Sequence, residues 1–285
     1  MIQALFAQFA AVIILGTAVY SYFYDKKAMP TLFAALIFSL VCVEYWFIAP
    51  LILVFAIWSE RMTYGTFAAM NLLSAVFMSY FMIWLYPNVG TISVLPFALA
   101  FIVCSIAIFG IFENHLRRYL MISSASQIAI IALHLSITGS YVWATMQVFN
   151  YAIAGLCLFL TIGVFARNKT FIYELEGSVN TDRLNDAFAT IACLSLAGLP
   201  LFNMFVSEWH ALTVAFASSP ATSVLMILSS VLLFIMYYKI TYVLLVGEGK
   251  RHEAPKLVTI INGFLALMII ALGLTPAIAF IEGIL

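Results

Sequence analysis

The chain has 285 residues, of which 65% are hydrophobic and only 8% are charged, and its formal net charge at pH 7 is +0. A soluble domain of this size does not keep that balance in water, so most of the chain is expected to lie in lipid. The neutral net charge and the lack of basic runs exclude a nucleic-acid-binding face.

Apolar runs long enough to cross a bilayer recur along the whole chain. A transmembrane helix needs about 20 apolar residues to cross about 30 Å of hydrocarbon. About nine runs meet this length, and they predict an all-α integral membrane protein with a single polytopic domain over residues 1–285. The first run is too long for the core of a signal peptide, so we expect it to be retained. The predicted spans are 4–24, 31–58, 62–86, 91–113, 118–137, 141–166, 186–217, 221–247 and 257–281.

Lysine and arginine are distributed unequally between the predicted loops. Only Lys26 and Lys27 follow an odd-numbered span. The loops after even-numbered spans hold nine, which are Arg61, Arg117, Arg118, Arg167, Lys169, Arg183, Lys250, Arg251 and Lys256. Because short cytoplasmic loops are enriched in these residues, we expect the N-terminus on the cytoplasmic (or matrix) side of a cell or organelle inner membrane. Residues 168–186 then form a cytoplasmic polar loop or surface helix.

Three ionisable residues fall well inside the predicted spans: Glu44, Glu208 and Lys239. Such residues are costly in a bilayer and usually mark an ion path. Glu44 lies about 20 Å from each surface, which makes it a candidate for proton relay. Lys239 is a candidate to hold a neighbouring glutamate ionised. Two alternatives stay open: a protonated Glu44 bonded between packed helices, and a Lys239 ammonium that reaches the interface along its stem.

A proline and a glycine interrupt the seventh predicted span. The run from 186 to 217 is too long for one straight crossing, and Gly198 and Pro200 predict a helix broken between them. Broken helices at membrane depth face protein or a water-filled cavity, where they bind or relay ions. Glu208 is expected eight residues, or about 12 Å, past the break. The alternative is a packing kink with an incidental glutamate.

Two histidines lie near the ends of predicted spans. His134 and His210 are expected to be interfacial and hydrogen-bonded, although His210 is close in sequence to Glu208. The four cysteines, at 42, 104, 157 and 193, lie in apolar runs without metal-ligand spacing. The chain has no dinucleotide, nucleotide, haem or iron–sulfur motif. We therefore expect no metal, no cofactor and no catalytic centre of its own.

Two stretches carry a resemblance to a known family. Residues 117–127, RRYLMISSASQ, resemble the segment (K/R)RLLAYSSISHMG of the antiporter-like subunits of complex I, of membrane-bound hydrogenases and of multisubunit cation/proton antiporters. Residues 196–209, LAGLPLFNMFVSEW, are similar to the broken helix LAGIPPFNGFVSEW of that family. The run CVEYWFIAP at 42–50 resembles the family segment FWELMSLP, with Glu44 six residues before Pro50 where the family has five.

The resemblance also has departures. The sequence contains no PLHxWLPDAH segment and no membrane lysine before Lys239. Gln127 stands where the family has histidine, and Tyr151 and Gly155 stand where it has histidine and lysine. The resemblance therefore implies a shortened subunit without the usual lysine helices, mainly structural, with at most a partial ion path through Glu208, Glu44 and Lys239.

What the resemblance implies about function is a membrane-arm subunit of a multisubunit complex that pumps H⁺ or Na⁺. The complex is either redox-driven, like an NADH dehydrogenase or a hydrogenase, or an antiporter assembly, and its other membrane subunits are the expected partners. Two alternatives stay open. One is a purely structural or assembly subunit, and the other is a free-standing secondary transporter, which should show a second broken helix to pair with the first.

Overall fold

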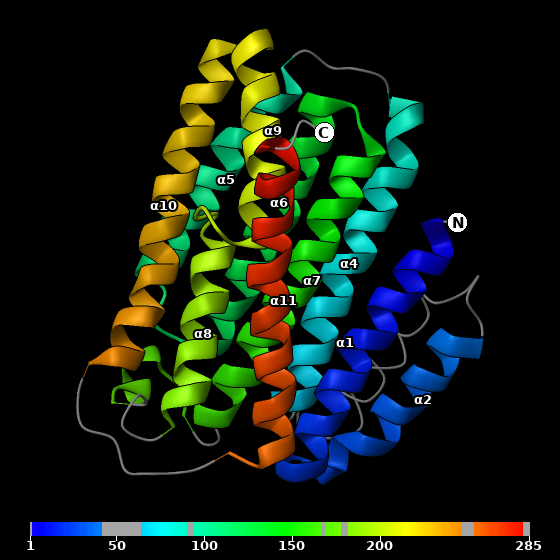
Figure 1. The fold of residues 1–285 in the computed structure, drawn as a ribbon, viewed down its shortest axis with the longest axis vertical. Helices are drawn as coiled ribbons and strands as arrows, with labels where there is room; N and C mark the ends of the chain where they lie inside the picture. Colours follow the sequence, from blue (N-terminus) through cyan, green and yellow to red (C-terminus); the bar gives the residue numbers. More distant parts are fainter. Residues whose placement is uncertain are drawn as a thin grey trace.

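The structure is a computed structural model that describes residues 2–41, 64–89, 94–166, 169–177, 182–246 and 254–281. Over these ranges the chain forms a bundle of long helices (Figure 1) and an isolated β-bridge between His115 and Phe171, without β-strands. The helices are α1 (Ile2–Tyr24), α2 (Met29–Val41), α4 (Tyr64–Val89), α5 (Leu95–Phe112), α6 (Leu116–Thr138), α7 (Tyr141–Phe165), α8 (Arg183–Leu196), α9 (Asn203–Ser218), α10 (Pro220–Leu245) and α11 (Lys256–Ile281).

Seven of the described helices are long and apolar enough to cross a membrane: α1, α4, α5, α6, α7, α10 and α11. They confirm an all-α membrane protein and coincide with seven of the predicted spans. The predicted span 186–217 is divided into α8 and α9, and the predicted span 31–58 is described only as far as Val41. The number of nine is therefore not confirmed.

Helix α7 forms the centre of the bundle. Apart from a few buried polar residues such as Gln147 and Asn150, its side chains are apolar, and 94% of its membrane-spanning window is buried inside the protein. It contacts α1, α4, α6, α8, α9 and α11. A helix that is hydrophobic all round is expected in such a position. By contrast, only 28% of the corresponding window of α5 is buried, because most of its apolar side chains face outward as lipid-facing residues do.

The first helix runs antiparallel to α4. The Tyr20 hydroxyl donates to the carbonyl oxygen of Gly163 at 3.0 Å, and the Tyr20 ring lies 5.8 Å from the Tyr64 ring. At the other end of α1, the Phe6 ring lies 5.1 Å from the Tyr80 ring. The C-terminus of α1 therefore lies at the end of the bundle where α4 begins (Figure 1).

This arrangement contradicts one step of the sequence interpretation. Counting residues 31–58 as one crossing placed Lys26 and Lys27 on the side opposite Arg117. In the structure the chain leaves α1 and enters α4 at the same end, so a single crossing does not lie between them. The predicted span 31–58 itself is not tested beyond Val41, because residues 42–63 lie outside the described part of the chain.

The correction makes the charge asymmetry stronger. Seven described lysines and arginines of the connecting segments lie at one end of the bundle, called the basic end from here on: Lys26, Lys27, Arg117, Arg118, Lys169, Arg183 and Lys256. Short contacts join these segments, such as the Leu116 amide donating to the Thr170 carbonyl at 2.9 Å. The N-terminal end of α1 lies at the opposite end of the bundle (Figure 1).

The polar segment before α8 is ordered by local hydrogen bonds over residues 169–177. A short 3₁₀ helix forms at Ile172–Leu175, with Ile172 and Leu175 buried against the bundle. The Glu174 carboxylate accepts from the backbone amides of Phe171 and Thr170, and these bonds lower the pKa of Glu174. Their contribution to stability is thus present above the unfolded pKa of Glu174 and is lost as the pH falls.

Candidate functional site

The break between α8 and α9 is built by a glycine rather than by the proline. Gly198 has φ +71°, and its amide donates to the Ser195 carbonyl at 2.8 Å. The Leu199 amide donates to the Leu194 carbonyl at 3.2 Å. These two bonds define a Schellman motif, which ends a helix with a left-handed residue. Pro200 follows two residues later and prevents the helix from resuming at once.

Side chains from the two neighbouring helices α6 and α7, and from α8 and α9 themselves, satisfy polar groups that the break exposes. The amide of Gln127 on α6 donates to the carbonyl oxygen of Leu196 at 3.1 Å. On α7, the amide of Asn150 donates to the carbonyl oxygen of Asn203 at 2.8 Å. The Asn203 side chain donates back to Asn150 and accepts from the Ser195 hydroxyl at 2.6 Å. The break is thus a hydrogen-bonded polar junction. Such pairing is expected because unpaired backbone groups at membrane depth are costly.

Glu208 lies against the break and not one helical turn or more beyond it. A Cβ atom added to Gly198 would overlap the Glu208 carboxylate. The predicted separation of about 12 Å was wrong because it assumed that α9 continues the axis of α8. The chain instead loops out through Leu201, which has φ +79° and is 64% exposed, before α9 begins. Absence of a side chain at residue 198 therefore makes room for the carboxylate.

The Glu208 carboxylate faces a cavity of about 360 Å³. The cavity lies between α6, α9 and α10, and the break forms part of its wall. The Oε1 atom of Glu208 is buried and has no hydrogen-bond partner in the described part of the chain. The side-chain amide of Gln147 lies beside the Glu208 carboxylate. The Gln147 Nε2 atom likewise has no hydrogen-bond partner among the described residues. Gln147 is engaged through its oxygen, which accepts from the Ser207 hydroxyl.

His134 lines the same cavity, contrary to its predicted interfacial position. It is 1% exposed, and its Nδ1 atom is buried without a partner among the described residues. Its position near the C-terminus of α6 suggested contact with water, but the α8–α9 break and α10 cover it. No sequence signal near His134 indicates this burial. His210 remains half-buried outside the cavity and stacks on Trp143 with ring centroids 3.9 Å apart.

Uncharged residues stand where the family resemblance would place histidine and lysine on α6 and α7. The hydroxyl of Tyr151 donates to the Ser124 hydroxyl at 2.7 Å, and the space beside Gly155 is filled by Leu72. Gln127 also donates to the Tyr237 hydroxyl at 3.3 Å. Each position therefore serves packing and hydrogen bonding, and none of the three carries a charge.

Lys239 binds the end of a neighbouring helix instead of facing Glu208. Its ammonium group donates to the carbonyl oxygens of Ile111 at 2.9 Å and Glu113 at 2.7 Å, at the C-terminus of α5. These carbonyls lack partners within the helix and carry the negative end of its dipole. The geometry agrees with the alternative in which the lysine stem reaches toward the interface.

We expect Lys239→Met to lower the free energy of unfolding by about 1 kcal/mol, because two charge-assisted bonds to α5 are lost. Ion transport by the assembled protein should stay within about twofold of the parent. Denaturant unfolding in mixed micelles and transport in proteoliposomes measure the two effects. Lost transport with unchanged stability would instead place Lys239 on an ion path.

The other predicted residues are Glu44 and the cysteines. Glu44 lies outside the described residues. Cys104, Cys157 and Cys193 are buried free thiols. Within the described ranges, no three His, Cys, Asp or Glu side chains are grouped so that they could hold a metal ion.

Comparison with known proteins places the chain in a family. The sequence profile described as NADH:quinone oxidoreductase/Mrp antiporter, transmembrane, matches residues 62–235, which is more than half of the chain. The chain belongs to this antiporter family. The match includes α4 to α9, and therefore the break, Glu208 and His134. A comparison with curated protein sequences gives no match.

Solved structures share the fold of this family member. A chain of respiratory complex I from Thermus thermophilus is 16% identical and superposes with a TM-score of 0.65, covering 96% of this chain and 85% of that one. A chain of the Mrp complex from Dietzia sp. DQ12-45-1b is 18% identical, with a TM-score of 0.58 and coverage of 96% and 64%. A chain of an archaeal membrane-bound sulfane sulfur reductase is 18% identical and superposes with a TM-score of 0.57, covering 97% of this chain and 61% of that one. This antiporter-family chain thus covers less than two thirds of the length of the Mrp chain and of the sulfane sulfur reductase chain.

Proposed function

We propose that the chain is a membrane-arm subunit of a multisubunit ion-translocating complex, and that it contributes a partial proton path at Glu208. The observation that carries this proposal is the Glu208 carboxylate, whose buried Oε1 atom has no partner among the described residues. It packs against a broken helix and lines a cavity together with His134. Family membership supplies the context in which such a carboxylate translocates ions.

A purely structural carboxyl would be expected to have its hydrogen bonds satisfied. Buried polar groups in native proteins are nearly always paired, and each exception calls for an explanation such as a bound water or a functional role. Here an acid (Glu208) and a base (His134) line one cavity, and each has a buried atom without a partner among the described residues. A cavity of about 360 Å³ has room for several waters, since each takes about 30 Å³. We infer that water in this cavity links the two side chains.

The same cavity favours protons over sodium ions. A hard cation such as Na⁺ requires several oxygen ligands, by analogy with the oxygen-rich sites of other hard cations. Glu208 is the one carboxylate on the described cavity wall, and the Ser229 and Ser230 hydroxyls already donate to the Met226 carbonyl. A carboxyl group and an imidazole are instead suited to exchange a proton.

The path is partial because the described polar groups that follow the break toward the basic end are uncharged. From the break, the next polar groups are Gln127, Tyr237 and Ser123, joined by hydrogen bonds of 3.3 Å and 2.8 Å. These groups are uncharged, and Lys239 is occupied at the end of α5. We propose that a neighbouring subunit supplies the remaining charges. The lack of the usual lysine helices, inferred from the sequence, is consistent with a chain that spans 64% and 61% of two structural relatives.

Partnership with other membrane subunits is tested by purifying the full chain in a mild detergent. We expect it to migrate with other membrane subunits, whose identification would distinguish a complex I-like or hydrogenase-like assembly from an antiporter assembly. A chain that migrates alone and transports ions by itself would contradict the proposal and favour the free-standing transporter.

Substitution Glu208→Gln is expected to reduce proton transport by the reconstituted complex about tenfold or more, because glutamine cannot accept and release a proton. A pH-sensitive dye inside proteoliposomes measures the rate. The matched control is Glu176→Gln, which neutralises an exposed carboxylate in the segment before α8 and should leave the rate unchanged. Equal rates for parent and Glu208→Gln would make the chain a scaffold subunit.

The basic end is proposed to face the cytoplasm or matrix, which puts the N-terminal end of α1 on the opposite side. In a variant without native cysteines, Lys27→Cys and Glu176→Cys should react with an impermeant maleimide from the cytoplasmic side alone. Val142→Cys, which is 76% exposed at the other end of the bundle, should react from the far side alone. Labelling of Lys27→Cys together with Val142→Cys would contradict both the orientation and the antiparallel placement of α1 and α4.

A further inference from the structure

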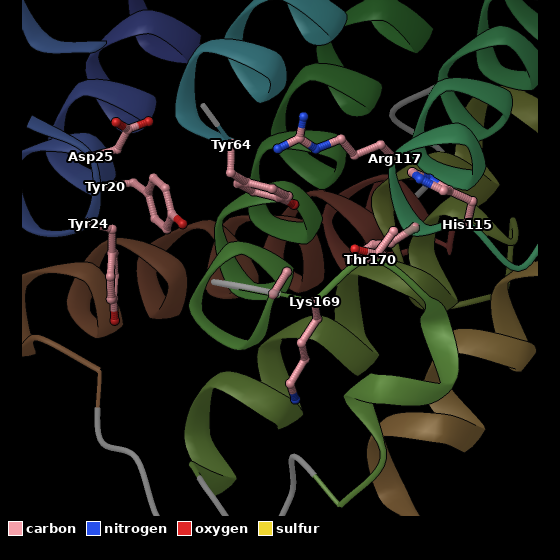
Figure 2. A pocket seen from close by; sticks show the side chains of 10 residues that line it. Tyr20, Tyr24, Asp25, Tyr64, His115, Arg117, Lys169 and Thr170 are labelled. Atoms are coloured by element: carbon pink, nitrogen blue, oxygen red, sulfur yellow. The ribbon is translucent and has the colours of Figure 1, made fainter. Parts of the chain in front are cut away.

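A second cavity, of about 550 Å³, lies at the basic end of the bundle, away from Glu208. It is formed where α1 and α7 end and where α4 and α6 begin, and the segment at Lys169 and Thr170 closes one side (Figure 2). These helix ends lie at the depth of lipid headgroups if the helices cross the bilayer. The proposed proton path uses none of the side chains that line this cavity.

One side of the cavity carries positive charge. Figure 2 shows the Arg117 side chain reaching across the cavity toward Tyr64, with His115 on the other side of Arg117 in this view. Arg117 is held by its contact with the Phe67 ring, 5.8 Å from the centroid, and makes no ion pair with a described residue. The His115 Nδ1 atom is buried and has no partner among the described residues. A guanidinium fork is suited to bind a phosphate through two parallel hydrogen bonds.

The opposite side is aromatic and acidic. Tyr20, Tyr24 and Tyr64 form a row of rings with centroid distances of 4.9 Å and 5.8 Å. The hydroxyls of Tyr20 and Tyr64 donate to carbonyls of α7, at Gly163 and Phe159, so the rings are fixed as a wall. Asp25 lies beyond Tyr20 in Figure 2, and its buried Oδ2 atom has no partner in the described part of the chain. Aromatic faces and a carboxylate together attract an ammonium group.

The cavity therefore has two chemically different sides. One is suited to bind a phosphate and the other an ammonium group, and tyrosine rings separate them. We propose that it binds the headgroup of an ethanolamine phospholipid, with the phosphate at Arg117 and His115 and the ammonium at Asp25 and the tyrosines. Lys169 adds charge at the rim, where its ammonium points away from Arg117 in Figure 2. Partial burial lowers the pKa of Lys169, and Glu174 opposes that change.

The proposal is tested by native mass spectrometry of the full chain after delipidation, titrated with phosphatidylethanolamine, phosphatidylglycerol or phosphatidylcholine. We expect one phosphatidylethanolamine to bind at least tenfold more tightly than either of the other lipids. Phosphatidylglycerol lacks the ammonium, and phosphatidylcholine lacks the N–H donors for Asp25. Equal binding of phosphatidylglycerol would overturn the assignment.

Two variants and one control locate the bound lipid. Arg117→Gln should weaken binding of every phospholipid at least tenfold, whereas Asp25→Asn should abolish the preference for ethanolamine and keep the phosphate contact. Arg118→Gln removes an adjacent but exposed charge and should change neither. An equal loss in Arg118→Gln would show general surface attraction and contradict a built site. If Arg117→Gln does not fold, as judged by its melting temperature, the Asp25→Asn result still decides.

The same titration with phosphoethanolamine and with inorganic phosphate distinguishes a lipid from a soluble ligand. We expect neither compound to compete with the phospholipid at tenfold excess, because acyl chains between the helices contribute to the affinity. Competition at equal concentration would identify a soluble phosphate ester as the ligand and overturn the lipid assignment. This inference is independent of the proton path at Glu208.

Discussion

Replacing Gly198 with alanine is expected to lower the free energy of unfolding by about 2–5 kcal/mol. Two effects contribute. The residue has φ +71°, a left-handed conformation that costs an L-residue about 1–2 kcal/mol. The added methyl group would also overlap the Glu208 carboxylate, which has to move or displace the break. Denaturant unfolding in mixed micelles measures the change.

Gly139 provides a matched control for the backbone effect alone. It ends α6 with φ +61°, and the nearest atom to an added Cβ is the Tyr86 hydroxyl oxygen at 3.7 Å. Gly139→Ala should therefore cost about 1–2 kcal/mol. In a Glu208→Ala background, the cost of Gly198→Ala should fall to the same value, because the overlap is gone. An unchanged cost in that background would show that Glu208 does not lie against the break.

The second large effect is expected for Asn203→Leu, with a loss of about 2–4 kcal/mol. Asn203 is fully buried, accepts from Ser195 and donates to Asn150. Leucine fills the volume but leaves these partners unsatisfied at membrane depth. Single interhelical hydrogen bonds in membranes average only about 0.6 kcal/mol, so a larger loss is expected only because several groups lose their partner together.

Asn114→Leu is the control for this prediction, since Asn114 is exposed at the start of the segment before α6 and should change stability by less than about 0.5 kcal/mol. Proton transport gives a second measurement. Asn203 orders the N-terminus of α9, which carries Glu208 five residues later, so transport should decline in folded protein as well. A loss near 0.6 kcal/mol with normal transport would mean that the junction is not required to position the carboxylate.

The predictions for Gly198→Ala and Asn203→Leu concern the same physical problem. A helix that stops inside a membrane leaves backbone groups unpaired, and the protein satisfies them with Gln127, Asn150, Asn203 and Ser195. This junction is what allows Glu208 to approach Gly198 and face the cavity. The proposed proton chemistry therefore depends on residues that never exchange a proton.

The sequence by itself determined the class of protein, the positions of most helices and the family. Long apolar runs fix transmembrane helices because lipid leaves the backbone no other partner than itself, and the motif at 196–209 located the break correctly. It also singled out Glu208 as a candidate, because an ionisable residue is conspicuous where nearly all others are apolar. These signals are local, and each can be read within about one helix length.

Only the tertiary structure decided which groups meet. His134 lines the same cavity as Glu208 although 74 residues separate them, since the packing of α6 against α9 and α10 is not encoded in either run alone. Lys239 was left between two interpretations by its position in the sequence, and its contacts at the end of α5 favour one of them. The direction of α1 also depended on contacts with α4 and α7, because hydrophobicity reports that a segment is in lipid but not which way it runs.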